Sequence, residues 1–126
     1  MDPVKILIAE DDLFLRELYT DILSGEGYKI EAAINGEEAL QKIKVGGYSL
    51  VLLDIIMPKM NGLEIMKQMQ NSPSQTPNKC VIFLTNLDKE EEIKEALQLG
   101  NGYLIKSKIT PGNLIDEVKK YLNQYK

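Results

Sequence analysis

The sequence predicts an α/β fold built on a doubly wound, five-stranded parallel sheet with helices on both faces. Short apolar runs alternate five times with stretches of helical periodicity, which is the pattern of repeated strand–helix units. Some runs are apolar at every position, as expected of parallel strands buried on both sides. The length of 126 residues suits one closed hydrophobic core, so we interpret residues 1–126 as a single domain.

Each predicted strand is a short, mainly apolar run of strand length. The third run, Leu50-Val51-Leu52-Leu53, contains no polar residue, so it is expected to be buried on both faces of the sheet. Right-handed crossovers place a helix against the sheet after each strand. The five runs span residues 5–9, 28–33, 50–53, 81–84 and 103–105.

Helices are expected between the strands, where apolar residues recur at every third or fourth position. The first helix has this spacing at Leu15, Leu18, Tyr19, Ile22 and Leu23, and the last at Leu114, Ile115, Val118, Tyr121 and Leu122. Capping residues mark several boundaries. The pairs are Asn35 with Glu38, Asp88 with Glu91, and Thr110 with Pro111. Gly25 and Gly27 are expected to end the first helix, and the polar segment 71–78 to connect into the fourth strand.

Composition excludes several classes of chemistry. The chain has no histidine, which removes Ser-His-Asp triads, imidazole bases, histidine metal ligands and phosphohistidine carriers. Its one cysteine, Cys80, can form neither an internal disulfide nor a multi-cysteine zinc site, and a reducing cytoplasm is the expected location. The net charge of -4 argues against direct binding of nucleic acid. No apolar run is long enough for a membrane span or a signal peptide.

Polar and charged residues directly follow the predicted strands. They are Glu10, Asp11 and Asp12 after the first, Asp54 after the third, Thr85 after the fourth and Lys106 after the fifth. Ligands of such sheets bind beyond the carboxyl ends of the strands, so these side chains are expected to converge on one edge. Three carboxylates about 4 Å apart would repel by roughly 4 kcal/mol per pair, and a bound cation relieves that repulsion. An all-oxygen site suits Mg²⁺, and Mn²⁺ could substitute.

Structural explanations compete with this interpretation. Glu10 or Asp12 could simply cap the helix that follows, since carboxylates complement helix N-termini. Lys106 could be a solvated surface lysine. Asp54 is harder to explain structurally, because four apolar residues precede it and Ile55-Ile56-Met57 follow.

Four segments together resemble the receiver domain of two-component response regulators, of the chemotaxis-regulator type. They are KILIAEDD, LVLLDIIMPKMNG, VIFLT and GYLIK, in family order and spacing, with Arg16 after Asp11 as in the family pattern. The resemblance covers nearly the whole chain. It implies a flavodoxin-like (βα)5 fold with strand order 2-1-3-4-5.

The resemblance also implies a role for each site residue. Asp54 would be the phosphoacceptor, and Lys106 would pair with the phosphoryl group. Glu10, Asp11, Asp54 and the backbone carbonyl of Ile56 would hold the cation, with Asp12 outside its coordination shell. Thr85 and Tyr103 would form a switch, although Tyr103 could equally be a core or surface tyrosine. Physically, phosphoryl transfer depends on alignment and charge stabilisation, and a carboxylate can act as the nucleophile.

The implied function is a signalling switch, rather than an enzyme with a separate substrate, that catalyses its own phosphorylation and slow dephosphorylation. A histidine kinase or phosphotransfer protein would supply the phosphoryl group. A downstream protein would bind the face formed by the fourth helix, fifth strand and fifth helix. The chain itself would be a monomer or a phosphorylation-dependent dimer. Phe14 could contact the donor protein or pack in the core. The sequence does not identify the kinase, the output, or whether the chain is a stand-alone regulator or a fragment.

Four positions and one segment depart from the family pattern. Ser107 replaces the usual proline, so we predict a trans Lys106–Ser107 peptide, because a cis bond before serine costs about 2.5 to 4 kcal/mol. Asn86 replaces a small residue, which predicts narrower access to the site. Ile56 and Leu87 are apolar and cannot position water, which predicts slow self-dephosphorylation. The segment 100–103 looks one residue short.

Three rival interpretations share parts of the pattern. A haloacid dehalogenase-type phosphatase needs a second aspartate where Ile56 stands. A Rossmann or flavodoxin-like nucleotide-binding module needs a glycine-rich or hydroxyl-rich loop where Glu10-Asp11-Asp12 stands. The remaining alternative is a receiver-like adaptor that binds partners without being phosphorylated.

Overall fold

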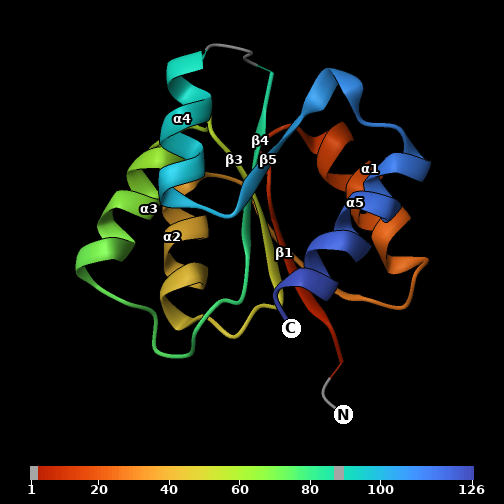
Figure 1. The fold of residues 1–126 in the computed structure, drawn as a ribbon, viewed down its shortest axis with the longest axis horizontal. Coiled ribbons are helices and arrows are strands. Elements are labelled where there is room, and N and C mark those ends of the chain that lie inside the picture. The colour runs from red at the N-terminus through yellow and green to blue at the C-terminus, as the bar shows by residue number, and fades with distance from the viewer. Residues whose placement is uncertain (1–2, 87–89) are drawn as a thin grey trace.

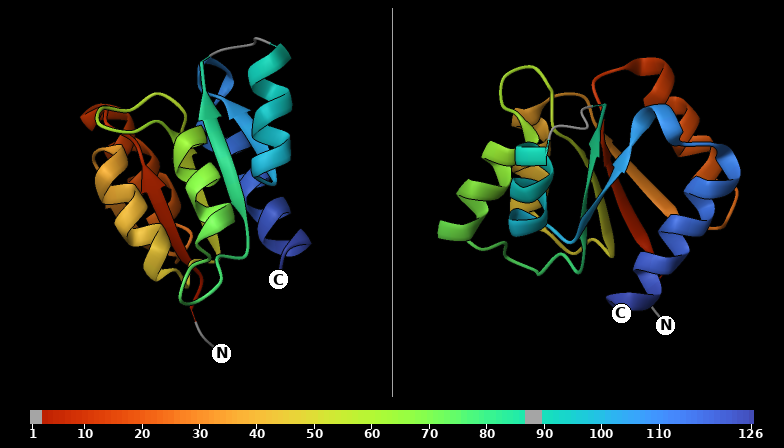
Figure 2. Two further views of the ribbon diagram at one scale, coloured as in Figure 1. Left: turned by 90° about the vertical axis from the view of Figure 1, so that its left-hand side faces the viewer. Right: turned by 45° about the horizontal axis from the view of Figure 1, so that its top comes forward.

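The computed structural model describes residues 3–86 and 90–126, and they form three layers. A central sheet is covered by α2, α3 and α4 on one face and by α1 and α5 on the other (Figure 1). The two further views in Figure 2 show the same arrangement from the side and from above. The predicted doubly wound α/β architecture is therefore confirmed.

All five strands are parallel, and their order is β2-β1-β3-β4-β5. The expected order 2-1-3-4-5 is confirmed, and each strand lies within one residue of its predicted bounds. The sheet pairs Leu7 with Glu31 and Val51, and Leu53 with Ala9 and Phe83. The strands are β1 (Lys5–Ala9), β2 (Lys29–Ala33), β3 (Leu50–Asp54), β4 (Val81–Thr85) and β5 (Gly102–Ile105).

The helices begin and end with the local chemistry that the sequence predicts. Asn35 and Thr110 are N-caps, and Thr110 forms a reciprocal capping box with Asn113. Gly25 caps the end of α1. The predicted pair of Asp88 with Glu91 lies partly outside the described residues. The helices are α1 (Leu13–Ser24), α2 (Gly36–Val45), α3 (Gly62–Asn71), α4 (Glu90–Leu99) and α5 (Pro111–Gln124).

The sheet divides the core into two apolar clusters, because side chains along a strand alternate between its faces. Ile6 and Ile8 of β1 pack with α1 and α5, whereas Leu7 and Ala9 pack with α2, α3 and α4. The same alternation holds along β3 and β4. This alternation decides which site residues face which layer.

The connection of α3 to β4 is held by backbone contacts with the end of α2. Residues 71–78 form the predicted connection, and Gly46 pairs with Thr76 in an isolated parallel bridge. Gly47 N also donates to Thr76 O at 3.1 Å. The close approach of the two backbones depends on glycine, because Gly46 has φ of 78° and ψ of −159°.

A charged network joins β1, β2 and the residues just before β3 near one edge of the sheet. Lys5 Nζ lies 2.9 Å from Glu31 Oε2, and the buried Tyr48 donates its hydroxyl to Glu31 Oε1 at 3.0 Å. Lys5 Nζ also lies 4.8 Å from the centre of the Tyr48 ring. The hydrogen bond from Lys5, followed by that from Tyr48, holds the pKa of Glu31 below its ordinary value despite partial burial.

Glu31→Gln is expected to lower the free energy of unfolding by about 1 kcal/mol at neutral pH, since it removes the charge but keeps an acceptor for Tyr48. A lowered carboxyl pKa stabilises the fold above the unfolded value of 4.5, and that stabilisation is lost as pH falls through the folded pKa. Urea unfolding of both proteins across this range checks the prediction. A difference between them that did not shrink in acid would contradict it.

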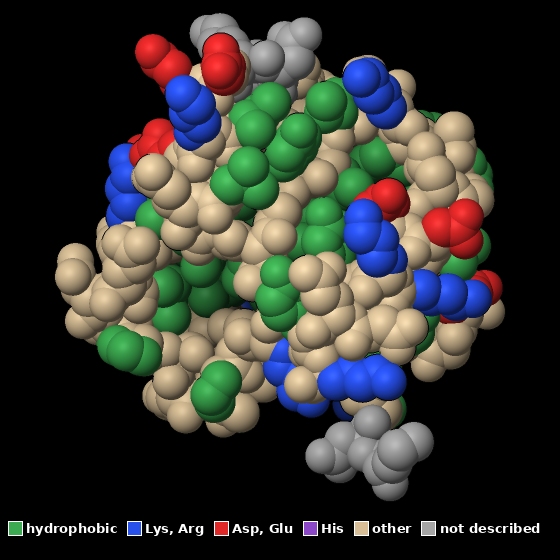
Figure 3. All heavy atoms as spheres, viewed as in Figure 1, with side chains coloured by type: hydrophobic (Ala, Val, Ile, Leu, Met, Phe, Trp, Pro, Cys, Tyr) green, Lys and Arg blue, Asp and Glu red, His purple; other side chains and the backbone are tan. Residues whose placement is uncertain are grey.

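Among the described residues, no helix is both long and apolar enough to cross a membrane. On the face drawn in Figure 3, lysine and arginine side chains are interspersed with acidic ones. The residues coloured on that face therefore form no continuous basic patch.

Candidate functional site

The predicted polar residues converge at the carboxyl edge of the sheet, around a pocket of about 290 Å³. Asp54 ends β3, Thr85 ends β4, and Lys106 follows β5 in a single 3₁₀ turn. Glu10 and Asp11 follow β1. The pocket is lined by Glu10, Asp11, Asp12, Leu15, Asp54, Ile55, Ile56, Thr85, Asn86 and Lys106.

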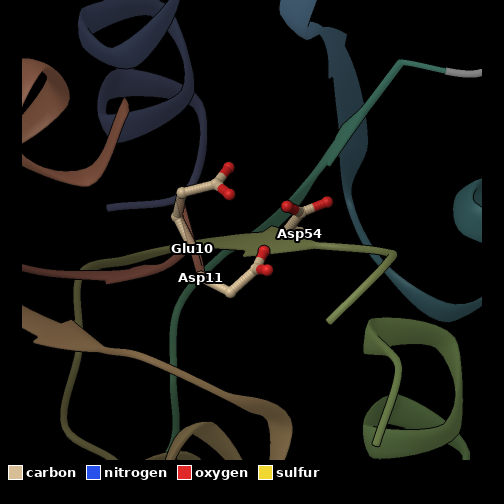
Figure 4. A group of neighbouring side chains, drawn as sticks. All are labelled: Glu10, Asp11 and Asp54. Carbon is tan, nitrogen blue, oxygen red and sulfur yellow. The ribbon is translucent and has the colours of Figure 1, made fainter. Parts of the chain in front are cut away.

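Three carboxylates meet in this pocket. Figure 4 shows the Glu10, Asp11 and Asp54 side chains converging from the ends of β1 and β3. One oxygen from each carboxylate lies within 4.8 Å of the others. Glu10 and Asp54 are buried, and Asp11 is exposed at the mouth. Two buried carboxylates and one open one leave an accessible position among oxygen ligands, which suits a divalent cation.

Among residues 3–86 and 90–126, Lys106 provides the positive charge closest to the buried carboxylates. Its Nζ donates to Asp54 Oδ2 at 2.5 Å and lies 2.7 Å from Glu10 Oε2. Only 10% of its side chain is exposed, so the alternative of a solvated surface lysine is wrong. Burial by itself lowers the pKa of Lys106, but the hydrogen bonds to Asp54 and Glu10 outweigh it, and the pKa is raised. The amine therefore stays protonated.

The charges at the site do not balance. Among the described residues, the clustered carboxylates of Glu10, Asp11 and Asp54 face one ammonium, which leaves two negative charges when all are ionised. Burial raises the pKa of Glu10 to about 7, and the charge of Asp54 adds to the rise while Lys106 opposes it. Glu10 Oε1 accepts a hydrogen bond from Asp12 N, and Oε2 lies 2.7 Å from Lys106 Nζ, its one polar partner among the described residues. A carboxylate oxygen with a single polar partner keeps a lone pair for a cation.

Asp12 caps the following helix, as its structural interpretation predicted. Its Oδ1 accepts from Leu15 N at 2.9 Å. Sequence reasoning did not predict the contacts of Arg16, whose Nη1 donates to the main-chain oxygens of Glu10 at 2.9 Å and Asp11 at 3.3 Å. A basic residue one turn into a helix that follows an acidic turn is a signal for such contacts. Arg16 thus holds the turn that presents both carboxylates.

The remaining predicted residues lie in distinct environments. Thr85 is buried at the end of β4, and Tyr103 is half-buried in β5, paired in register with Phe83. Phe14 is 72% exposed, so its alternative placement in the core is wrong. The Lys106–Ser107 peptide is trans, as predicted.

Two predictions, on access to the pocket and on hydrolysis of the phosphoryl group, concern residues at the rim of the pocket. Ile56 is 64% exposed beside the carboxylates, and its N–H donates to Asp54 Oδ1 at 3.2 Å. Asn86 is exposed and lines the pocket, so its effect on access stays a prediction. Leu87 lies outside the described residues.

Comparison with known families identifies the chain. The model of the response regulator receiver domain matches residues 6–119, so this chain belongs to that family. Transcriptional regulatory protein CrdR of Helicobacter pylori is 35% identical over 120 residues, which cover 94% of this chain and 55% of that protein. The chain spans about half the length of the first curated relatives it matches.

Solved structures agree with this assignment. A CheY-like receiver domain protein of Methanospirillum hungatei matches with a TM-score of 0.85 and 29% identity, over 98% of this chain and 97% of that one. Response regulator TrrA of Thermotoga maritima, in complex with Mg(2+)-BeF, matches with a TM-score of 0.78 and 33% identity, over 94% and 98%. The flavodoxin-like topology is confirmed, and the chain is a receiver domain of two-component response regulators.

Proposed function

We propose that this receiver domain accepts a phosphoryl group on Asp54 in a Mg²⁺-dependent reaction. The observation that supports it most is the position of Asp54, a buried carboxylate held by Lys106 and facing two further carboxylates. A buried aspartate held in this way is aligned as a nucleophile.

The donor is a histidine kinase or a phosphotransfer protein. An Asp54 oxygen attacks the phosphorus of phosphohistidine, a P–O bond forms as the P–N bond breaks, and the departing imidazole keeps the electron pair and takes up a proton. The Lys106 ammonium lies at the Asp54 oxygen and stabilises charge on the transferring group.

Glu10, Asp11 and Asp54 would hold the cation, together with the backbone carbonyl of Ile56. When bound, the cation neutralises charge on the phosphoryl oxygens. The unbalanced negative charge fits this role, and so does Glu10 Oε2, whose one polar partner among the described residues is Lys106. The oxygen-only ligand set favours Mg²⁺ and tolerates Mn²⁺.

The phosphoryl group then shifts the equilibrium between two conformations. Thr85 moves its hydroxyl to the phosphoryl group, and Tyr103 follows inward from its half-buried position in β5. A change of this kind requires the phosphoryl group to favour one state by a few kcal/mol.

The downstream partner binds the face formed by α4, β5 and α5. In Figure 3 apolar side chains gather on the side of the molecule where these elements lie. A hollow of about 400 Å³ there is lined by Tyr103, Leu104, Ile105, Lys108, Ile109, Asn113, Leu114, Glu117 and Tyr121. The protein acts in the cytoplasm, as a monomer or as a dimer formed on phosphorylation.

Incubation with acetyl phosphate and Mg²⁺, followed by intact mass spectrometry, tests the proposal. The wild type is expected to gain the mass of one phosphoryl group, and Asp54→Asn to gain none. Chelation of Mg²⁺ is expected to abolish the gain in the wild type. No gain with acetyl phosphate or a phosphorylated kinase would instead favour the adaptor that works without phosphorylation.

Ile56→Asn is expected to accelerate loss of the phosphoryl group by about tenfold, because an amide at this exposed rim position can orient the attacking water. The decay of the phosphorylated mass after removal of donor gives the rate. Ile56→Val is the matched control, since it keeps an apolar side chain and should decay like the wild type. Equal rates for the asparagine variant and the wild type would contradict the prediction.

A further inference from the structure

The Tyr19 hydroxyl is a buried polar group with no hydrogen bond among the described residues. Tyr19 lies in α1, is 1% exposed and packs in the apolar cluster between the sheet and the helices α1 and α5. An unpaired buried hydroxyl destabilises a fold, and phenylalanine would fill the same space without it. The core alone therefore explains the ring of Tyr19 but not its hydroxyl.

The alternation of the strands places the phosphorylation site on the same side of the sheet as Tyr19. Asp54 continues the face of Leu50 and Leu52, which pack in the same cluster as Tyr19. By the same alternation Glu10 follows Ile8, and Lys106 follows Leu104. The three residues joined by the Lys106 ion pairs thus lie above the α1 layer.

The geometry of α1 directs the Tyr19 hydroxyl toward these residues. Leu15 lines the pocket, and Tyr19 lies one helical turn further along the same face. Long side chains in a helix point back toward its N-terminus, and α1 begins directly beneath the acidic turn. Burial raises the pKa of Tyr19, and the charge of Glu10 is the next largest cause, which is consistent with this proximity.

Glu10 supplies the acceptor that Tyr19 lacks. Its Oε1 accepts from the N–H of Asp12, while the buried Oε2 has the Lys106 ammonium at 2.7 Å as its one polar partner among the described residues. A carboxylate oxygen can accept more than one hydrogen bond, so Oε2 keeps a free lone pair. The site thus contains one unpaired donor and, on the same face of the sheet, a carboxylate oxygen that can accept a further hydrogen bond.

We propose that Tyr19 is a positioning residue, whose hydroxyl donates a hydrogen bond to the Glu10 carboxylate through one buried water. The hydrogen bond orients Glu10 as a ligand of the divalent cation. Hydrogen bonds of this kind commonly change metal affinity by one to two orders of magnitude when they are removed. The inference rests on the proposed function, because it assigns Glu10 to the cation.

Tyr19→Phe removes only the hydroxyl, so it separates positioning from packing. Titration with Mg²⁺ alone, followed by calorimetry, is expected to show a dissociation constant raised about tenfold. Stability to urea in the presence of a chelator should be unchanged or higher. Tyr28→Phe is the matched control, since this half-buried tyrosine packs in the same cluster next to the opposite end of the sheet, and its affinity should equal that of the wild type.

A metal-free measurement distinguishes failure of this inference from failure of the proposed function. The carbon-13 shift of the Glu10 carboxyl, recorded well above the pKa of that group, is expected to move in Tyr19→Phe and not in Tyr28→Phe. An unmoved shift, or an unchanged dissociation constant in a wild type that binds Mg²⁺, would overturn the role of Tyr19. A wild type that bound no Mg²⁺ would overturn the proposed cation site. The carbon-13 shift of Glu10 alone would then decide whether Tyr19 interacts with Glu10.

Discussion

Lys106→Met is expected to lower the free energy of unfolding by about 3 kcal/mol in the absence of divalent cation. The substitution leaves the buried carboxylates of Glu10 and Asp54 without the ammonium that lies at 2.7 and 2.5 Å from them. Removing one partner of a buried ion pair is destabilising, because the remaining charge has lost its hydration and no longer has an opposite charge beside it. Methionine fills similar volume, so the loss reports charge rather than packing.

Two comparisons check this interpretation. Lys119→Met removes the same charge from an exposed pair with Glu26 at 3.0 Å and is expected to change stability little. Mg²⁺ is expected to restore part of the stability lost in Lys106→Met, because a cation that binds the folded state compensates the carboxylates. Urea unfolding with and without Mg²⁺ measures both effects. Equal losses for the two lysine variants would show that the buried ion pairs contribute no more than an exposed one.

Gly46→Ala is expected to destabilise the fold by about 3 kcal/mol or more. A Cβ atom on Gly46 would lie 1.7 Å from Thr76 O, which is backbone and cannot rotate away. The φ of 78° and ψ of −159° also belong to a region that only glycine populates readily. The substitution must therefore separate the end of α2 from the connection between α3 and β4.

Gly27→Ala separates the cost of the backbone conformation from the cost of the steric clash. Gly27 has φ of 87° but nothing within 4 Å of an added Cβ, so only the conformational cost of about 1 to 2 kcal/mol applies. Urea unfolding of both variants measures the difference between them. A similar loss at both positions would mean that the backbone near Thr76 yields easily, and that the close approach of α2 contributes little to stability.

Much of the site was predictable because parallel strands share one carboxyl edge. Once five strands were placed, the residues following each had to converge, and Glu10, Asp54 and Lys106 do. The helix caps at Asn35 and Thr110 were equally predictable, since capping is local chemistry between residues three apart.

Other features depended on contacts that periodicity does not encode. Tyr19 has the spacing of an apolar helix face, and nothing in that spacing distinguishes a hydroxyl buried without a hydrogen bond from one that reaches solvent. Arg16 could be aligned with a family pattern, but its hydrogen bonds to two main-chain oxygens depend on how the chain folds around them. The contact of Gly46 with Thr76 joins residues thirty positions apart and leaves no local signal.

The order of apolar and polar residues alone determined the strands, the helices, the edge of the sheet that carries the chemistry, and the residues that reach it. Periodicity and capping act over a few residues, so they can be read along the chain. Tertiary packing alone decided burial, the bridging of two carboxylates by one lysine, and the layer beneath the site. These depend on distances between segments far apart in sequence, and on the removal of water that makes the charges at Glu10, Asp54 and Lys106 act strongly on one another.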